Sequence, residues 1–496
     1  MRGYFTANID IQNSGAVVAS PDHNTPGGSY YYHWARDGAL TMHALQITAS
    51  GQKGYDTQMQ HYAKWVVGRH AESDPNNIDV RIEPKFTIPD GQPYTGGWCR
   101  PQTDGPGLRA ITLIAYANDL ISRGDTDFVS QYLWTGDASA YSGGAIKYDL
   151  DWLASNWDQS GCDLWEEVQS TDFFWNRYTM RKALAHGAQF AQKMGDSQSA
   201  QSYNSVLQTL NGTLARHFNG QFVFEEDNRQ KDAAVMCAFN DGDMMDGVFA
   251  PNGGEVAGTI STLNDLFSST FPINQKDNQA GVPGILYGRY AGDQYAGGNP
   301  WILTSGCLAE TLYRAANATA AQNKMPPPTA ASHFKGIVRD LNPAALAAVA
   351  AAEGKALDLD TPAGLARALV LSGDGVLNRI RYHTINNNLH QPEQLDKNTG
   401  QEASATDLTW SYATILKAMK ARDDTMATLA VRSDGQQGQS SAAFAANTQN
   451  GGSNSSNQAA SWLPYVAGGV VAVALIVGVV ALLRRHNPRR AYAPIA

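Results

Sequence analysis

Charged side chains are scarce in this chain of 496 residues, where they make up only 17% of the total. The formal net charge is −9, although four arginines (Arg484, Arg485, Arg489 and Arg490) lie within the last thirteen residues, so the remainder is more acidic still. Proteins that bind nucleic acid need a basic surface against the phosphates. The composition therefore argues against a nucleic-acid partner and is compatible with a neutral ligand.

The motifs of several cofactor chemistries are also missing. The sequence contains no P-loop, no dinucleotide-binding fingerprint, no HExxH and no GxSxG. The acidic run Asp241–Asp246 does not have the spacing of a calcium loop, and we interpret it as a surface turn. The sequence thus predicts no metal site and no cofactor.

Cysteine is rare, with four residues that never form a CxxC pair: Cys99, Cys162, Cys237 and Cys307. They allow one or two disulfides, and the sequence does not fix the pairing. Three glycosylation sequons, at Asn211, Asn317 and Asn454, would suit a glycoprotein. Cysteines and sequons together favour an oxidising compartment.

Alternating strand patterns are almost absent, whereas helical periodicity recurs along the chain. Loops rich in Gly, Pro and aromatic residues separate the helical segments. We therefore expect an all-α architecture. The expected helices are 41–50, 55–70, 108–122, 128–133, 146–156, 173–193, 197–217, 263–271, 300–318, 344–353, 361–371 and a last one near 412.

No apolar signal sequence follows Met1, but a long apolar run lies near the other end. Residues 426–462 are rich in Ser, Gln, Asn and Gly, which predicts a flexible linker. Residues 463–483 are apolar, uncharged and long enough to span a bilayer, and the basic tail 484–496 predicts a cytoplasmic C-terminus. We therefore expect a single-pass membrane protein whose domain 1–425 faces the cell exterior or the lumen of a vacuole or secretory organelle.

The stretch GCDLWEEV at 161–168 gathers three carboxylates (Asp163, Glu166 and Glu167) around Trp165. Carboxylates packed this closely beside an apolar ring should include one with a raised pKa, which holds a proton near neutral pH. A neutral carboxylic acid beside an aromatic platform is what a glycosidase needs to protonate a leaving oxygen. The alternative is a helix start, with Asp163 as N-cap and Glu166 as its capping-box partner.

Three further segments combine aromatic rings with groups that form hydrogen bonds to sugars. YYYHWARDGAL at 30–40 places Arg36 and Asp37 directly after aromatic residues, where they can grip hydroxyls while rings stack on the sugar face. The Gly/Pro-rich segment 84–109 carries Trp98. A third such loop, GRYAGDQYAGGNPW, spans 288–301. In isolation, each aromatic or charged group could equally be part of a buried structural contact.

Taken together, these segments resemble the glucoamylases, inverting exo-acting α-glucosidases of glycoside hydrolase family 15. The resemblance rests on YYYHWARDGAL, PKF with YTGGWCRPQTDGPGLRA, YDLDWLASNWDQSGCDLWEEV, GRYAGDQYAGGNPW, and EQLDKNTG with DLTWSY, in the family's order over about residues 12–422. It implies an (α/α)6 barrel, two concentric rings of helices with the site in the loops at one end. It also implies release of β-glucose from the non-reducing ends of α-1,4-glucans.

The resemblance carries roles onto matching positions. Glu166 matches the general acid, while Asp163, Trp165 and Glu167 would bind substrate or tune the acid. Arg36, Asp37 and Arg289 match groups that fix hydroxyls of the terminal glucose. Tyr30 or Tyr32 would lie beneath that sugar, and Trp98 matches a loop tryptophan near the acid.

The catalytic base is where this chain departs from the expected pattern. An inverting glycosidase needs a second carboxylate across the sugar to deprotonate water. Gly400 is followed by Gln401, which cannot accept that proton, and Glu402 comes one position later. We predict Glu402 as the base. Gln401 leaves open an alternative, a catalytically impaired membrane receptor for glucans; another is a related (α/α)6 hydrolase acting on α-1,6-glucan or trehalose.

Two segments of the family are not apparent here. The family's first helical segment is largely missing before Asn8, from which we expect an incomplete N-terminus and a threat to barrel closure. No starch-binding domain follows the linker, so soluble maltooligosaccharides or dextrins should be better substrates than raw starch granules.

Overall fold

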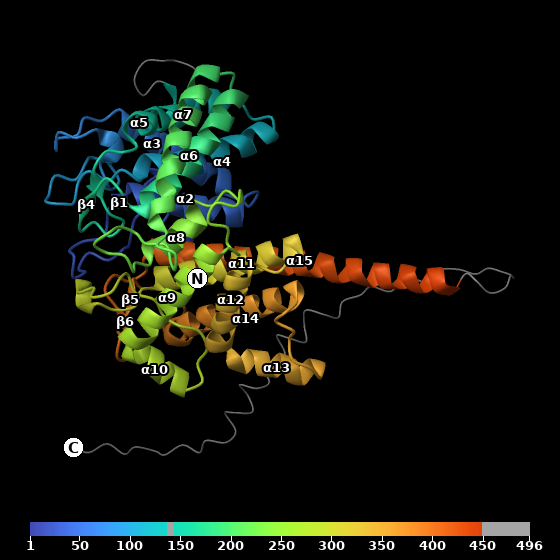
Figure 1. Cartoon of the computed structure of the whole chain (residues 1–496). Coiled ribbons are helices and arrows are strands. Elements are labelled where there is room, and N and C mark those ends of the chain that lie inside the picture. The colour runs from blue at the N-terminus through green and yellow to red at the C-terminus, as the bar shows by residue number, and fades with distance from the viewer. Residues whose placement is uncertain (136–142, 449–496) are drawn as a thin grey trace, which may run out of the picture. The chain divides into compact units, whose positions relative to one another are not determined.

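The computed structural model describes residues 1–135 and 143–448, the side chains of 432–448 excepted. Residues 1–435 form one compact unit (Figure 1), and residues 436–496 form a second, of which only the end of one helix is described. The described residues are mainly helical, which confirms the predicted all-α class.

Six helices make up the inner layer of the compact unit. Neighbouring pairs pack in the order α2–α4–α6–α8–α11, and α15 contacts both α8 and α11, since Lys417 on α15 forms ion pairs with Asp241 and Glu310. All eight residues of α8 are buried, as expected for a helix enclosed on every side. The inner helices are α2 (Ala35–Ala49), α4 (Gly105–Ser122), α6 (Phe174–Lys193), α8 (Ala234–Asp241), α11 (Ile302–Gln322) and α15 (Thr409–Thr448).

The other helices lie outside this layer, and all of them except α13, which has no buried residue, bury part of their surface. In α7, for example, only Ser199, Ala200, Tyr203, Leu210 and Leu214 are buried. Proline occupies the first turn of α10, α12, α13 and α14, where its missing N–H is not needed for a helical bond. These helices are α1 (Arg2–Ala7), α3 (Tyr55–His70), α5 (Ala145–Asn156), α7 (Ser197–Leu214), α9 (Gly254–Thr270), α10 (Pro272–Gln279), α12 (Pro328–Leu341), α13 (Pro343–Glu353) and α14 (Pro362–Thr384).

Three very short antiparallel pairs of strands fasten the loops at one end of the helices. β1 (His33–Trp34) pairs with β2 (Lys85–Phe86), β3 (Gly161–Cys162) with β4 (Gln169–Ser170), and β5 (Gln394–Leu395) with β6 (Glu402–Ala403). In Figure 1 the labelled strands gather on the left of the molecule. These pairs hold the loops that carry the predicted site residues.

Helix α14 is longer than predicted, because Gly373 and Gly375 do not end it. Glycine usually weakens a helix. Here a side chain would not fit, since a Cβ on Gly373 would lie 2.6 Å from the ring of Tyr313 on α11, and one on Gly375 would lie 3.1 Å from the carbonyl oxygen of Leu341. Close packing between helices therefore explains the two glycines, and the helix runs through them to Thr384.

The compact unit and its last helix both run beyond residue 425, where the sequence predicted the start of a linker. The compact unit extends to Gly435, and α15 continues through the first part of the predicted linker to Thr448. Residues 426–431 (MATLAV) include Met, Ala and Leu, which favour helix. The rest of the linker, the apolar run 463–483 and the tail 484–496 lie outside the described residues.

No helix within the described ranges is long and apolar enough to cross a membrane. Two of the sequons are also not in the surface loops expected for glycosylation. Asn211 lies in α7 and accepts a hydrogen bond from Arg181 at 2.7 Å; Asn317 lies in α11 and accepts one from Thr428 at 2.7 Å. Asn454 is outside the described residues.

The beginning of the chain contacts the start of α15. The Asn8 side chain donates to the Thr409 hydroxyl at 2.9 Å and to the Asp407 carbonyl at 3.0 Å. The segment after α1 is thereby fixed to the start of α15, and the inner layer contains all six helices.

Candidate active site

A cavity of about 250 Å³ opens among the loops that precede the inner helices. Its size is at the small end for ligand sites. The aromatic residues around it are Tyr30, Trp34, Trp98, Trp165, Tyr295, Trp301 and Trp410, and the charged residues are Arg36, Asp37, Glu166, Glu167, Arg289 and Glu393. Rings with interspersed charged hydrogen-bonding groups suit a ligand with apolar faces and many hydroxyls.

Glu166 is held on a turn between β3 and β4. The Asp163 carboxylate accepts the backbone N–H groups of Trp165, Glu167 and Val168 at 3.2, 2.7 and 2.9 Å. Glu166 itself has a left-handed backbone with φ of 66°, which is uncommon for a residue with a side chain. Asp163 therefore caps a turn, and the alternative interpretation as a helix start is wrong because a strand follows.

The Glu166 carboxylate contacts two donors. Its Oε1 accepts from the Arg36 guanidinium at 2.9 Å and from the Gln102 side-chain amide at 2.9 Å. Arg36 also donates to Gln102 at 3.0 Å and to Asp104 at 3.2 Å. One network thus joins the turn of residues 163–168, the acid turn, to the start of α2 and to the loop before α4.

Asp37 lines the same cavity from the first turn of α2. Burial raises its pKa to about 7, opposed by Arg36 and reinforced by the negative charges of Glu166 and Asp104. The sequence predicted a raised pKa among the carboxylates of the acid turn. Burial also raises the pKa of Glu393, another carboxylate that lines the cavity.

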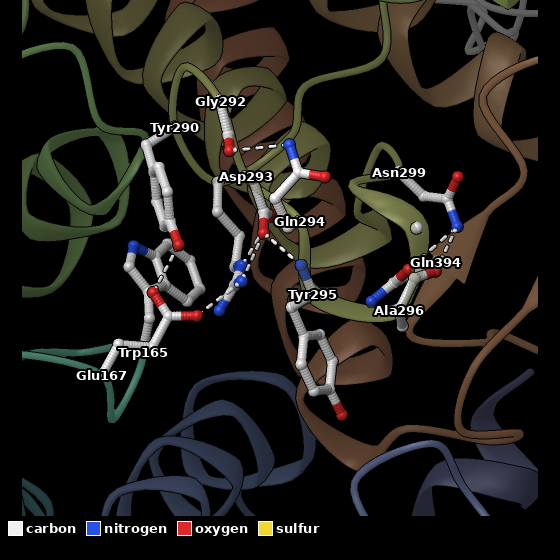
Figure 2. A network of polar contacts seen from close by, with 12 residues as sticks. Trp165, Glu167, Tyr290, Gly292, Asp293, Gln294, Tyr295, Ala296, Asn299 and Gln394 are labelled. Carbon is white, nitrogen blue, oxygen red and sulfur yellow. Dashed lines mark hydrogen bonds and ion pairs between the residues drawn. The ribbon is translucent and has the colours of Figure 1, made fainter.

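Glu167 points toward the loop that follows Arg289 (Figure 2). Arg289 lies 2.8 Å from a Glu167 oxygen and also donates to Asp293 at 2.8 Å, while the Tyr290 hydroxyl donates to Glu167. The guanidinium carbon of Arg289 lies 5.2 Å from the centre of the Trp301 ring. Ion pairs and aromatic rings hold the Arg289 guanidinium in place. Its remaining N–H groups can therefore donate to a ligand without a change in the side chain's conformation.

Glu393 is a cavity residue that the sequence analysis missed. Its carboxylate accepts from the Tyr30 hydroxyl at 2.9 Å and from the Ser404 hydroxyl. Burial raises the pKa of Glu393 to about 7, although the hydrogen bonds from Ser404 and Tyr30 lower it. The signal that could have found it is its place in EQLDKNTG, directly before β5. Trp34, Tyr295, Trp301 and Trp410 were likewise missed as lining residues.

Glu402, predicted as the base, is not among the residues that line the cavity. It lies on β6 opposite Leu395, and its carboxylate accepts from Asn387 at 2.6 Å. The strand pairing therefore does not bring Glu402 to Glu166. Glu393, which directly precedes β5, lines the cavity together with Glu166.

Most other predicted residues do meet at the cavity. Tyr30, Arg36, Asp37, Trp98, Trp165, Glu166, Glu167 and Arg289 all line it. Tyr32 and Asp163 are not among the lining residues. The Tyr32 ring packs against Trp34 and Tyr94, and the Asp163 carboxylate forms an ion pair with Arg229 beneath the acid turn.

The sequence matches a known protein family over most of its length. The sequence profile described as glycosyl hydrolases family 15 matches residues 4–420. The chain is 32% identical over 450 residues to a glucoamylase of Blastobotrys adeninivorans, covering 85% of this chain and 70% of that one. It is 31% identical over 438 residues to glucoamylase 1 of Rhizopus oryzae, covering 84% and 68%.

Solved structures agree with the sequence comparison. The glucoamylase of Saccharomycopsis fibuligera superposes with a TM-score of 0.72 at 27% identity, covering 86% of this chain and 94% of that one. The family 15 glucoamylase of Hypocrea jecorina gives 0.70 at 29% identity, covering 85% and 70%. The predicted (α/α)6 barrel is thereby confirmed for the catalytic part.

Proposed function

The chain belongs to glycosyl hydrolase family 15 and is a glucan 1,4-α-glucosidase that releases glucose from the ends of α-glucan chains, and we propose that the cavity around Glu166 and Glu393 performs this reaction. The observation that supports the proposal is that Glu166 and Glu393 line the same small aromatic cavity. Cleavage of a glycosidic bond requires two such groups, one on each side of the sugar.

Glu166 is the general acid in this proposal. It protonates the oxygen of the bond that breaks, so that the departing chain leaves as a neutral alcohol. Arg36 and Gln102 both contact the Oε1 oxygen of Glu166. They orient the carboxyl group, and after proton transfer they stabilise the carboxylate that remains.

Glu393 is the general base. It accepts a proton from a water molecule, and the water oxygen attacks the anomeric carbon from the face opposite the leaving oxygen. The configuration inverts, so an α-linked substrate yields β-glucose. Tyr30 and Ser404 fix the Glu393 carboxylate by hydrogen bonds. The receptor alternative rested on Gln401, and it loses its basis because Glu393 supplies the carboxylate that Gln401 lacks.

Asp37 and Arg289 hold the terminal glucose by its hydroxyls. Both are buried, and both have a charged neighbour in place before substrate arrives: Arg289 contacts Asp293, and the Asp37 carboxylate lies 3.8 Å from the Arg36 guanidinium. Groups that are already in place lose little freedom on binding. The limited volume of the cavity suits the end of a glucan chain and supports exo action.

The assignment is tested by proton NMR of maltotriose during hydrolysis. We expect early β-glucose from the wild type and a rate at least about 100-fold lower for Glu166→Gln and for Glu393→Gln, the usual contribution of general acid–base catalysis. Glu402→Gln is the matched control and should keep the wild-type rate. A large loss in Glu402→Gln with normal turnover in Glu393→Gln would overturn the base assignment.

We also propose that residues 463–483 anchor the enzyme in a membrane, with the catalytic unit on the extracellular or lumenal side. The support is the uncharged apolar run followed by RRHNPRR. In carbonate-washed membranes, full-length protein should remain in the pellet, and a variant with Leu475→Arg and Val479→Arg should move to the supernatant. Release of the wild type by carbonate would contradict the anchor.

A further inference from the structure

Two disulfides join distant parts of the chain, and only one of them reaches the cavity. Cys99 pairs with Cys162, 63 residues later, and Cys237 pairs with Cys307. Cys99 itself lines the cavity and directly follows Trp98, whereas Cys162 is buried at the end of β3, four residues before Glu166. The first disulfide therefore connects the segment that carries Trp98 to the turn that carries the acid.

Further contacts lie beside this covalent link. The Cys162 N–H donates to the Pro101 carbonyl at 2.8 Å, and the Gln169 side chain donates to the Arg100 carbonyl at 2.7 Å. A Cβ on Gly161 would lie 2.8 Å from a Thr103 side-chain carbon, so the two segments approach as closely as a glycine allows. The segments 99–103 and 161–169 are thus packed directly against each other beside the cavity.

The link also bears on the orientation of Glu166. Gln102, three residues after Cys99, donates to the Glu166 carboxylate at 2.9 Å. The position of the segment that carries Cys99 therefore determines a hydrogen bond of Glu166. The left-handed backbone of Glu166 costs free energy and persists only where its surroundings hold it. The acid turn has just two residues of strand on each side, so regular secondary structure supplies little of that support.

Trp98 is held independently on its other side. The Lys85 ammonium on β2 lies 3.7 Å from the centre of the Trp98 ring, and the Trp34 ring on β1 lies 5.6 Å away. These contacts fix Trp98 to the β1–β2 pair. Lys85 also interacts electrostatically with Glu166, and the disulfide adds the covalent connection between the Trp98 segment and the acid turn.

We propose that Cys99 and Cys162 are positioning residues for the hydrolysis, whose disulfide keeps Trp98 and Gln102 in register with Glu166. This inference rests on the proposed role of Glu166. When the link is absent, the acid turn and the Trp98 segment move apart while the helices remain folded, and the rate of bond cleavage falls. A displacement of about 1 Å in such a site costs on the order of 100-fold in rate, so we expect turnover to fall by roughly 10- to 100-fold.

The second disulfide provides a matched control. Cys237 on α8 and Cys307 on α11 are 0% and 2% exposed, and their helices pack directly against each other in the inner layer. Neither residue lines the cavity. Removing this disulfide should lower the unfolding temperature and leave turnover within about twofold of the wild-type rate, since its effect falls on the stability of the barrel.

The experiment compares full-length wild type, Cys99→Ala with Cys162→Ala, Cys237→Ala with Cys307→Ala, and Glu166→Gln. For each protein we measure kcat and KM for maltotriose at room temperature, together with the unfolding temperature. The proposal expects the loss in kcat only in the Cys99/Cys162 variant, with KM changing less. A Cys99/Cys162 variant with wild-type kcat and merely a lower unfolding temperature would overturn it. If Glu166→Gln is inactive while the wild type is active, the assignment of Glu166 as the acid stands, whichever result the Cys99/Cys162 variant gives.

A second arm remains informative if the Cys99/Cys162 variant does not fold. Folded wild type is treated with dithiothreitol, whose two thiols are oxidised to a cyclic disulfide while a cysteine pair is reduced to two thiols. Activity should fall while circular dichroism stays native, and it should return on reoxidation. The Cys237/Cys307 variant should respond in the same way. Full activity in wild-type protein whose Cys99 and Cys162 are shown to be reduced by thiol labelling would overturn the proposal.

Discussion

At the scale of single residues, the proposed acid Glu166 and the proposed base Glu393 differ in their hydrogen-bond partners. Glu166 contacts a guanidinium and an amide, while Glu393 contacts two hydroxyl groups. Burial raises the pKa of Glu393 to about 7, and the hydrogen bond from Ser404 acts in the opposite direction. A base must be deprotonated to act, so this hydroxyl extends activity toward lower pH.

Ser404→Gly should therefore shift the pH dependence of hydrolysis. Without the hydroxyl the carboxylate loses a donor, the pKa of Glu393 rises, and activity is lost at a higher pH as the solution is acidified. We expect the acidic limb of kcat/KM to move upward by on the order of one pH unit. Glycine suits the backbone here, because Ser404 has φ of 62°. Ser268→Ala, on an exposed position of α9, is the control; an unmoved limb in Ser404→Gly would contradict the role given to Glu393.

Residue identity alone did not reveal Glu393, the carboxylate that we propose as the base. Glu393 and Glu402 are nine positions apart in one loop region, and both are acidic residues near the last inner helix. What separates them is the register of β5 against β6, which pairs Leu395 with Glu402 and leaves Glu393 beside the Tyr30 hydroxyl. That register comes from tertiary contacts, which two-residue strands do not encode in a local pattern.

At the scale of elements, Arg229 stabilises the acid turn through ion pairs with two of its carboxylates. Arg229 forms ion pairs with Asp163, Glu167 and Asp232, and its side chain is only 13% exposed. Asp163 and Asp232 are 1% and 0% exposed at their side chains. Since Asp163 also caps the turn through three backbone N–H groups, the arginine supports the shape that presents Glu166.

Arg229→Gln should destabilise the protein and slow hydrolysis together. Removing one partner of a buried ion pair leaves uncompensated carboxylates, at a cost of about 3 kcal/mol in the free energy of unfolding. Arg123→Gln is the matched control, because Arg123 pairs with Asp56 where both side chains are 44% exposed, and a surface pair contributes less than about 1 kcal/mol. Urea unfolding of both variants measures the difference; equal losses would contradict the assigned role of Arg229.

The helices were more predictable than the segments between them. Periodicity placed α3 at 55–70 as observed, because a helix that buries one face shows that face in its sequence. It missed α8, whose eight residues are buried all round and show no such face. The strand pairs, of two residues each, are too short for alternation to be visible. The sequence therefore indicated several loops that line the cavity but not the strand pairs that hold them.

At the scale of the whole molecule, the cavity exists only because the ring of inner helices closes. Its lining residues run from Ala19 to Trp410, and they come from the starts of α2, α11 and α15 and from the loops before other helices. Residues almost four hundred positions apart therefore share one small volume. Resemblance to a family could indicate such a grouping in advance, whereas local patterns in the sequence could not.

The whole-molecule charge leads to a final prediction about association with substrate. The protein is acidic, with a net charge of −9, but glucans are uncharged, so its long-range field neither attracts nor repels them. The two arginines of the cavity, Arg36 and Arg289, are buried, with side chains 5% and 3% exposed, and salt screens buried charges much less than exposed ones. We therefore expect kcat/KM for maltotriose to change by less than about twofold between roughly 50 and 500 mM NaCl at constant pH. A tenfold dependence would mean that an exposed charge takes part in the rate-determining encounter, and the buried residues assigned here would then not account for substrate capture.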